Sequence, residues 1–196
     1  PNLRPEEGRN KELSLIWAEA GNTASVTWYR NDVTDLIDYQ SGAQQYRNVN
    51  KAKFEGWTFT AGSTVSEWNI SAAVDLLEAR DETTHQTLER RAKEKLSLNA
   101  DRNWGALTTG IELQAAGHRY SGLQRTSTFY DREALRMGGY TTFNVTAKYV
   151  LTPELTLELR GNNLANKQYT TIRANALYDY NAPGANYFVG LRYSMK

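Results

Sequence analysis

The chain has 196 residues, with 23 Lys and Arg against 22 Asp and Glu, and therefore a net charge of +1. Nucleic-acid binding needs a clustered basic surface, so this near-neutral balance argues against a nucleic-acid partner. The chain contains no cysteine, which excludes disulfides, thiolate zinc sites and cysteine nucleophiles. Its longest apolar run, Leu15 to Ala18, is far shorter than the about 20 residues of a transmembrane helix.

Hydrophobic residues make up 40% of the chain, and the mean hydropathy is −0.66. A soluble domain is usually richer in apolar residues, at about 45–50%. A low average also suits a transmembrane β-barrel, in which every second residue faces lipid and the others face a polar lumen. The relevant test for membrane insertion is therefore whether apolar and polar residues alternate along the chain, and not the average hydropathy.

Several segments alternate between apolar and polar residues at that period. In the clearest of them, Phe143, Val145 and Ala147 are separated by Asn144 and Thr146. The same alternation occurs in 23–28, 96–101, 155–160 and 186–196. It predicts β-strands with one apolar and one polar face.

The pattern predicts about nine strands, and all four prolines lie outside strand interiors, as ladder hydrogen bonding requires. Segment 46–60 is the least regular of them, and its faces cannot be assigned from the sequence. The helix-forming composition of 72–92 leaves a helix there as an alternative. The expected strands are 10–20, 22–33, 46–60, 66–80, 90–101, 104–119, 137–151, 154–164 and 186–196.

The connections between these strands alternate in length. Short turns are expected at 21–22, 61–65, 102–103 and 152–153. Long polar connections are expected at about 34–45, 80–90, 120–136 and 164–185. Outer-membrane barrels have this arrangement, with tight periplasmic turns and long external loops. The sequence therefore predicts an all-β fold, an antiparallel transmembrane β-barrel.

Nine is an odd number for an antiparallel barrel, and nine strands leave two unpaired edges, which are very costly in lipid. Part of a larger barrel therefore fits better than a complete one. If the last strand ends in the periplasm, the first strand descends from outside, and residues 1–9 belong to an external loop. Two alternatives stay open: a self-contained small outer-membrane barrel, such as an adhesin or a barrel enzyme, and a soluble β-sandwich binding module.

The sequence offers little to an enzyme. His85 and His118 are more than thirty residues apart and form no H-x-x-x-H ligand pair. The G-x-S-x-G and G-x-x-x-x-G-K motifs of hydrolases and nucleotide-binding loops are absent. We therefore expect no catalytic residue, no cofactor and no metal site.

Two sets of charged residues have structural interpretations. Three aspartates, Asp32, Asp35 and Asp38, recur every three residues and are expected to be solvated or to pair with Arg30 and Arg47, rather than to bind calcium. The other set lies on the polar faces of the expected strands and predicts a water-filled lumen or contact with a plug; it comprises Lys93, Lys95, Lys148, Glu158, Arg160 and Arg192.

Four short segments match known sequence motifs. PNLRPE at 1–6 is similar to an N-P-x-L-x-P-E segment that precedes a barrel strand, and YRNVNKA at 46–52, with Gly56, resembles a Y-x-N-x-x-x-A-x-x-x-G stretch. RRAK at 90–93 resembles a strand start, and GNNLANKQY at 161–169 resembles an N-L-F-D-x-x-Y box before a last strand. In these motifs and in their order the chain resembles the TonB-dependent outer-membrane receptors.

The chain departs from that pattern near its end. Ala165 and Asn166 stand where the box has Phe and Asp. Met195 stands, with Lys196 after it, where such barrels usually end on an aromatic residue.

Within the family, YRNDVTDLIDY at 29–39 is similar to a stretch of the BtuB-type cobalamin transporters. MGG at 137–139 and YNAPGANY at 180–187 also match their pattern. The resemblance implies a bacterial outer-membrane barrel of about 22 strands with a plug domain in its lumen. Residues 1–196 would be the C-terminal part of that barrel, with the plug domain and the N-terminal strands absent.

The same resemblance implies non-enzymatic binding and uptake of cobalamin or a related corrinoid, driven by the TonB complex through the plug. A siderophore or haem receptor is the alternative within the family. Tyr180 and Arg90 would face the ligand, with Tyr120, Tyr130 and Tyr178 as further candidates. The outer-membrane lipid is an expected partner, and two loop arginines, Arg80 and Arg125, are candidates to pair with lipopolysaccharide phosphates.

Overall fold

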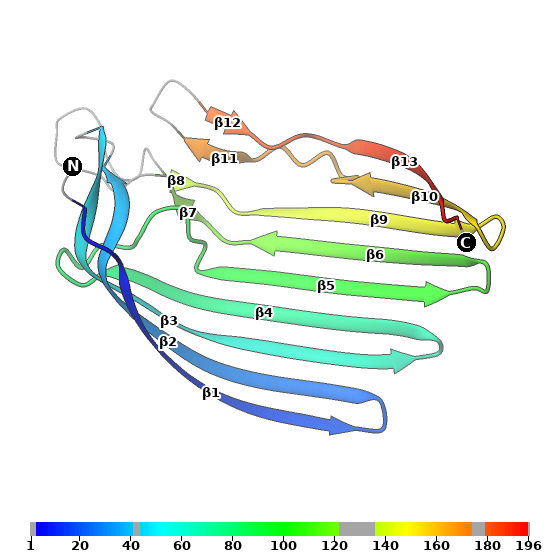
Figure 1. The fold of residues 1–196 in the computed structure, drawn as a ribbon, viewed down its shortest axis with the longest axis horizontal. Helices are drawn as coiled ribbons and strands as arrows, with labels where there is room; N and C mark the ends of the chain where they lie inside the picture. Colours follow the sequence, from blue (N-terminus) through cyan, green and yellow to red (C-terminus); the bar gives the residue numbers. More distant parts are fainter. Residues whose placement is uncertain (1–2, 41–43, 122–135, 174–178, 196) are drawn as a thin grey trace.

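The computed structural model describes residues 3–40, 44–121, 136–173 and 179–195. Nine strands form one open, antiparallel, curved sheet in the order β1-β2-β3-β4-β5-β6-β9-β10-β13, so that chain neighbours are also sheet neighbours (Figure 1). Its strands are β1 (Glu7–Glu19), β2 (Asn22–Gln40), β3 (Gln45–Val65), β4 (Trp68–Asp81), β5 (Glu94–Asn103), β6 (Leu107–Ala116), β9 (Tyr140–Val150), β10 (Leu155–Asn162) and β13 (Asn186–Tyr193).

The nine-stranded sheet is here called the wall, and the end of it that carries the long connections is called the long-loop end. Two small antiparallel sheets lie beyond that end. One pairs β7 (Arg119–Tyr120) with β8 (Arg136–Met137), and the other pairs β11 (Thr170–Arg173) with β12 (Asp179–Asn181). The expected all-β architecture is confirmed, as is the count of nine strands in the wall. The alternative helix over 72–92 is wrong, because 72–81 continues β4 and pairs with β3.

Two connections differ from their expected positions. The connection expected over 34–45 is mostly strand, because β2 and β3 continue as a paired ribbon to Gln40 and Gln45. The turn expected over 61–65 lies at Ser66 and Glu67 instead, whose φ angles of 49° and 69° are those of a tight hairpin turn. Neither residue is a glycine or an asparagine, so the sequence carries no clear turn signal there.

Short and long connections are sorted to opposite ends of the wall, as the sequence predicts. The tight turns after β1, β3, β5 and β9 lie together at the end nearest the C-terminus (Figure 1). The longer connections and the N-terminus lie at the other end. In the described part of the chain, no helix is long and apolar enough to cross a membrane.

The strand register gives the wall two faces of opposite character. On one face, here called the apolar face, Leu13, Trp28, Trp57 and Leu76 form one row across β1 to β4. This face continues to the last strand, where Val189 is 73% exposed. An exposed apolar surface of this extent is what a lipid-facing barrel wall requires.

The opposite face, here called the polar face, carries hydroxyls, amides and charges. Thr27, Thr58, Asp75 and Lys95 form a row across β2 to β5. The register also assigns segment 46–60, which the sequence left open: Trp57 belongs to the apolar face, with Thr58 on the polar face.

A small apolar cluster lies on the polar face near the long-loop end. Val33, Ala52 and Ala79 supply its floor, and the fully buried Leu88 of the β4–β5 connection packs onto them. The Leu88 backbone N–H donates to the carbonyl of Ala79 at 2.9 Å. The β4–β5 connection therefore folds inward over the wall.

Candidate ligand-binding site

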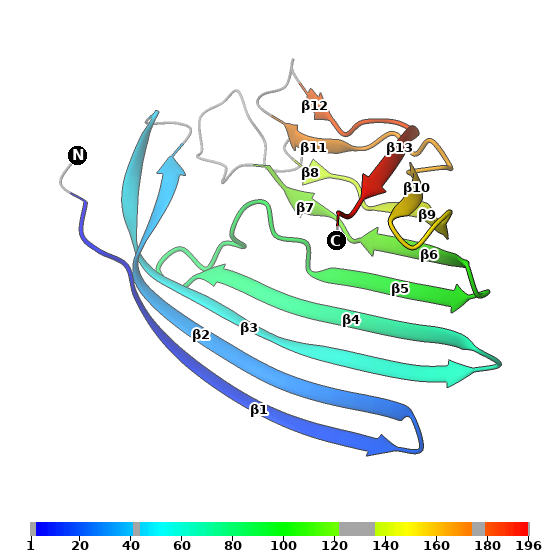
Figure 2. The same ribbon diagram turned by 45° about the vertical axis from the view of Figure 1, so that its right-hand side comes forward.

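The two small sheets are joined into one assembly at the long-loop end, here called the loop assembly (β7, β8, β11 and β12; Figure 2). The Arg119 guanidinium donates from Nη2 to the carbonyl of Thr170 at 2.6 Å. The backbone N–H of Arg173 donates to Ser121 Oγ at 2.8 Å. These contacts join two connections that lie about fifty residues apart in the chain.

Arg119 sits at the centre of this assembly beside a pair of stacked tyrosines. Its side chain is 9% exposed, and its guanidinium carbon lies 5.3 Å from the Tyr140 ring centroid. Tyr140 stacks on Tyr169 with 3.8 Å between ring centroids and 10° between ring planes. Burial, and then the neighbouring Tyr140, raises the pKa of Tyr169 above its usual value. Arg119 Nη1 is buried without a hydrogen-bond partner in the described part of the chain.

A second arginine holds the β11–β12 hairpin. Arg173 donates from Nε and Nη2 to the two carboxylate oxygens of Asp179, at 2.8 and 2.9 Å. Such a bidentate pair is stronger and more directional than a single ionic contact. The hydrogen bonds from Arg173 hold the pKa of Asp179 below its usual range.

Three of the expected ligand-binding residues lie in or against this assembly. The backbone N–H of Arg90 donates to the carbonyl of Tyr120 at 2.7 Å, which brings these two residues together. Arg90 is exposed and has a left-handed φ of 59°. Tyr180 lies on β12 opposite Ile172 and is 61% exposed.

The other two expected residues, Tyr130 and Tyr178, lie outside the described residues. Tyr120 is half-buried, and its ring meets the His118 ring edge-on, with 6.1 Å between centroids. Arg90 and Tyr180 therefore present the freer side chains of the expected set.

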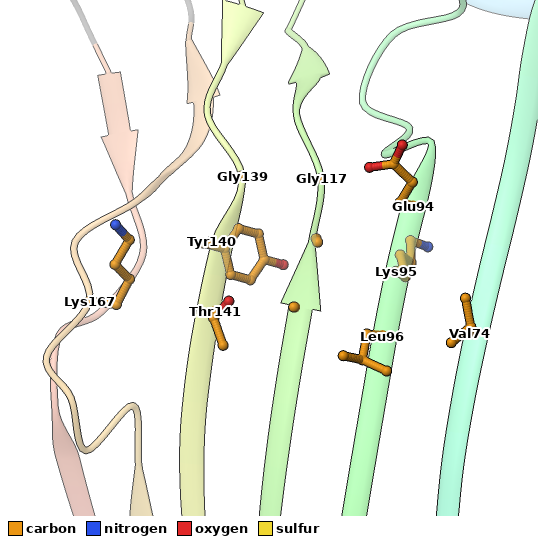
Figure 3. A pocket seen from close by; sticks show the side chains of 11 residues that line it. Val74, Glu94, Lys95, Leu96, Gly117, Gly139, Tyr140, Thr141 and Lys167 are labelled. Atoms are coloured by element: carbon orange, nitrogen blue, oxygen red, sulfur yellow. The ribbon is translucent and has the colours of Figure 1, made fainter. Parts of the chain in front are cut away.

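A cavity of about 720 Å³ opens beside the loop assembly, over the parts of β4, β5, β6 and β9 that face the long-loop end (Figure 3). Tyr140 lines it and so joins the cavity to the stacked pair. Lys95 on the wall and Lys167 on the β10–β11 connection also line it, with Glu94 as the carboxylate among its lining residues. The cavity therefore combines an aromatic ring with two exposed ammonium groups.

Two smaller cavities lie on the polar face nearer the tight-turn end, with volumes of about 630 and 240 Å³. Asp101 and Arg160 line both of them. Lower on the same face, Arg192 pairs with Glu158 at 3.3 Å. The charges that the sequence places on the polar faces of β9, β10 and β13 therefore do share one face of the wall.

Sequence reasoning missed the most constrained residues of the site, namely Arg119, Tyr140 and Tyr169. One signal was present in the sequence, the glycines that flank this region at Gly117 and Gly139. The structure gives the reason for one of them, because a Cβ on Gly139 would come within 2.8 Å of the Ala116 carbonyl oxygen. Such a close backbone approach marks a point where strands leave the regular ladder.

Among the described residues, no group of three or more His, Asp or Glu side chains could hold a metal ion. Asp32 pairs with Arg30 at 2.8 Å, as expected, whereas Asp35 pairs with Arg4 at 2.5 Å and not with Arg47. Asp32 and Asp35 therefore each form an ion pair with an arginine, and the side chain of Asp38 lies outside the described residues.

Comparisons with solved structures show the fold. The copper transporter OprC superposes with a TM-score of 0.80 at 16% identity, covering 99% of this chain and 32% of its own. The siderophore receptor PirA from Acinetobacter baumannii superposes with a TM-score of 0.78 at 18% identity, and the match covers 98% of this chain and 32% of PirA. The ferripyoverdine receptor of the Pseudomonas aeruginosa outer membrane superposes with a TM-score of 0.72 at 18% identity, and the match covers 97% of this chain and 27% of that receptor.

The chain thus spans between 27% and 32% of the length of these structures. A family model described as "TonB dependent receptor-like, beta-barrel" matches residues 1–164, which is most of the chain. The family consists of transporters and receptors rather than enzymes. The chain therefore belongs to the TonB-dependent receptor β-barrel family, whose members are outer-membrane proteins of Gram-negative bacteria.

Proposed function

We propose that this chain forms wall and external loops of a receptor that binds an anionic metal chelate of the siderophore class and imports it with energy from TonB. Residues 1–196 would supply the C-terminal part of a barrel of about 22 strands, with the plug and the remaining strands supplied by the rest of the receptor. The observation that carries the proposal is the cavity of about 720 Å³ beside the loop assembly, with its aromatic and cationic lining.

Charge is the main argument for an anionic cargo. Lys95 and Lys167 line the cavity, and Arg90 is exposed on the adjoining connection. The carboxylate of Glu94 offsets one of these charges, and a cleft that keeps an excess of one sign attracts ligands of the opposite sign and raises their rate of encounter. Tyr140 and Tyr180 add aromatic surface, which suits the flat rings of many chelators.

The names of the neighbouring structures are consistent with this class of cargo. PirA is named a siderophore receptor, the P. aeruginosa protein is a ferripyoverdine receptor, and OprC is named a copper transporter. Cobalamin remains the second candidate, supported by the similarity of residues 29–39 and by the exposed ring of Tyr180.

Competition binding to the full-length receptor separates the two cargoes. The receptor is titrated with a labelled ferric siderophore, and unlabelled ferric chelates and cyanocobalamin are compared as competitors. We expect ferric chelates to displace the label and cyanocobalamin to leave it bound. Tight binding of cyanocobalamin without binding of any ferric chelate would contradict the siderophore assignment.

A charge-neutralising pair tests the site itself. Lys95→Gln with Lys167→Gln should weaken binding of the ferric chelate about thirtyfold, since each of the two ammonium groups contributes on the order of 1 kcal/mol to an anion in a partly shielded site. Arg192→Gln is the control, because it removes a cation from the same face at the opposite end of the wall. Equal losses in both variants would place the cargo elsewhere.

A further inference from the structure

A charged patch lies on the apolar face of β1 to β4. It lies between the long-loop end and the row formed by Leu13, Trp28, Trp57 and Leu76. Positions nearer the long-loop end are called higher. The first row of the patch crosses the four strands as Lys11, Arg30, Glu55 and Glu78. Its second row crosses them as Arg9, Asp32, Lys53 and Arg80. Glu7 and Lys51 lie one step higher on the same face. These ten residues are called the outer charged patch.

The height of this patch matches the edge of a bilayer. A transmembrane β-strand needs about 9–11 residues to cross the hydrocarbon layer. Ten residues counted from the tight-turn end of β1 (Glu19) reach Asn10, and ten from that of β3 (Val65) reach Gly56. Ten from that of β4 (Trp68) reach Leu77. The patch therefore begins where the strands leave the apolar layer, and it faces away from the lumen.

Cations are in excess within the patch. It contains six Lys and Arg against four Asp and Glu; Glu82, one residue beyond β4 and beside Lys51, is a fifth carboxylate at its border, and cations still exceed anions by six to five when it is counted. Three ion pairs use three of each: Arg30 with Asp32 at 2.8 Å, Lys53 with Glu55 at 2.5 Å, and Arg80 with Glu78. In the described part of the chain, the remaining cations make no salt bridge; they are Arg9, Lys11 and Lys51.

The patch is local and not a uniform feature of the wall. At the corresponding upper positions of the apolar face, β6 has Ala115 and β9 has Thr141. Further along the wall, β10 has Gly161 paired with Tyr187 of β13. Of the strands that carry this face, the first four alone present basic side chains at this height among the described residues.

We propose that the outer charged patch binds the phosphorylated headgroup of an anionic lipid in the outer leaflet. A surface at this height that faces away from the lumen meets headgroups, and surplus Lys and Arg there recognise phosphate oxygens. Trp28 and Trp57 lie in the row directly below, where aromatic side chains sit at a membrane interface. Arg80, which the sequence suggested as a partner of lipopolysaccharide phosphates, lies in the patch, whereas Arg125 is outside the described residues.

This inference rests on the outer-membrane location of the family and not on the identity of the cargo. A second copy of the receptor could also meet this face, and the oligomeric state therefore has to be measured alongside lipid binding. The net positive charge of the patch argues against self-association there, because two copies of one basic surface repel each other.

The test uses the full-length receptor in detergent micelles and lipid A carrying its phosphates as the probe. Lys11→Gln with Lys51→Gln removes two of the unpaired cations, and Lys148→Gln with Arg192→Gln removes the same charge from the polar face. We expect the patch variant to bind lipid A about tenfold more weakly, and the polar-face variant to bind it like the unmodified receptor.

Three further measurements make the outcome decisive. Dephosphorylated lipid A should bind the unmodified receptor as weakly as lipid A binds the patch variant, and inorganic phosphate should not compete. Ferric-chelate binding should be the same in the patch variant and the unmodified receptor, so a failed cargo assignment would show there and not in lipid binding. Unchanged lipid A affinity in the patch variant, equal losses in both variants, or a dimer broken by the patch substitutions would overturn the proposal.

Discussion

Tyr140 and Tyr169 stack face to face with 3.8 Å between ring centroids, and this contact ties the β10–β13 connection to the start of β9. The start of the segment between β10 and β11 is held on β9 by the Leu164 N–H, which donates to the Phe143 carbonyl at 2.8 Å, and Tyr169 holds its far end, next to Thr170 at the start of β11. The stack therefore fixes a loop segment on the wall at the edge of the proposed cargo cavity.

Replacing Tyr169 by Leu should loosen this connection. An aromatic pair contributes about 0.5–1.5 kcal/mol beyond its buried area, so amide exchange over 163–173 should become roughly two to ten times faster. Hydrogen–deuterium exchange of the full-length receptor, read by mass spectrometry, measures the change. Tyr149→Leu on the apolar face of β9 is the matched control, and equal effects of the two substitutions would show that the stack does not hold the loop.

Gly56 in β3 is predicted to tolerate no side chain. The ring of Tyr29 crosses over it to donate its hydroxyl to Asp75 Oδ1 at 3.2 Å. A Cβ on Gly56 would come within 2.5 Å of the Tyr29 hydroxyl and would also collide with the Leu76 carbonyl oxygen. The Tyr29 ring therefore fits against β3 only because residue 56 is a glycine and has no side chain.

Gly56→Ala should destabilise the barrel by about 1–3 kcal/mol, the usual cost of overpacking. The thermal unfolding temperature of the full-length receptor, followed by circular dichroism or heat-modified gel mobility, measures it. Gly190→Ala in β13 is the control, because the nearest atom to its added Cβ is 3.9 Å away. Unfolding temperatures that fall equally in the two variants would contradict the close packing of Tyr29 on Gly56.

Leu88 is predicted to anchor the β4–β5 connection. It is fully buried against Val33, Ala52 and Ala79, and two residues later the backbone of Arg90 contacts Tyr120. Leu88→Ala should cost about 2–5 kcal/mol of local stability, because it leaves a cavity. The amide of Arg90 should then exchange faster.

The measurement is hydrogen–deuterium exchange over 86–93 in the full-length receptor. Leu159→Ala, which removes an equal volume from the exposed apolar face of β10, is the control. Protection of 86–93 that survives Leu88→Ala would show that other contacts position Arg90.

The wall could be predicted from the sequence because its strands follow a strict two-residue period. In β9, Asn144 and Thr146 alternate with Phe143, Val145 and Ala147, and the register confirms that these sets face opposite ways. The period failed over β3, because Lys53 and Glu55 share the apolar face with Trp57 and Phe59 but lie above the apolar layer. The two-residue period marks a face but not the height at which the bilayer ends.

The loop assembly could not be predicted, because its contacts join segments far apart in the chain. Arg119 and Thr170 are 51 positions apart, and Arg173 and Ser121 are 52 positions apart. No local pattern encodes either contact. The resemblance to known receptors predicts Arg90, Tyr120 and Tyr180 as ligand-binding residues, which stays a prediction, and it gave no signal for the buried arginine and the stacked tyrosines of the loop assembly.

The β11–β12 hairpin should open in acid. The hydrogen bonds from Arg173 lower the pKa of Asp179, so the folded hairpin favours the ionised carboxylate. A group whose pKa is lower in the folded state stabilises that state above its unfolded pKa, about 3.9 for Asp, and this contribution is lost as the pH falls through the folded pKa. The hairpin should therefore stay closed at neutral pH and loosen below about pH 4.

The Arg173 Nε–H signal in the nuclear magnetic resonance spectrum of the full-length receptor reports this transition directly, because that group donates to Asp179 Oδ1 at 2.8 Å. It should move toward the position of a solvated guanidinium as the carboxylate is protonated. In Asp179→Asn the signal should take a pH-independent position, since the substituted amide does not titrate. A signal that titrates alike with and without the Asp179 carboxylate would assign the acid sensitivity to another group of the loop assembly.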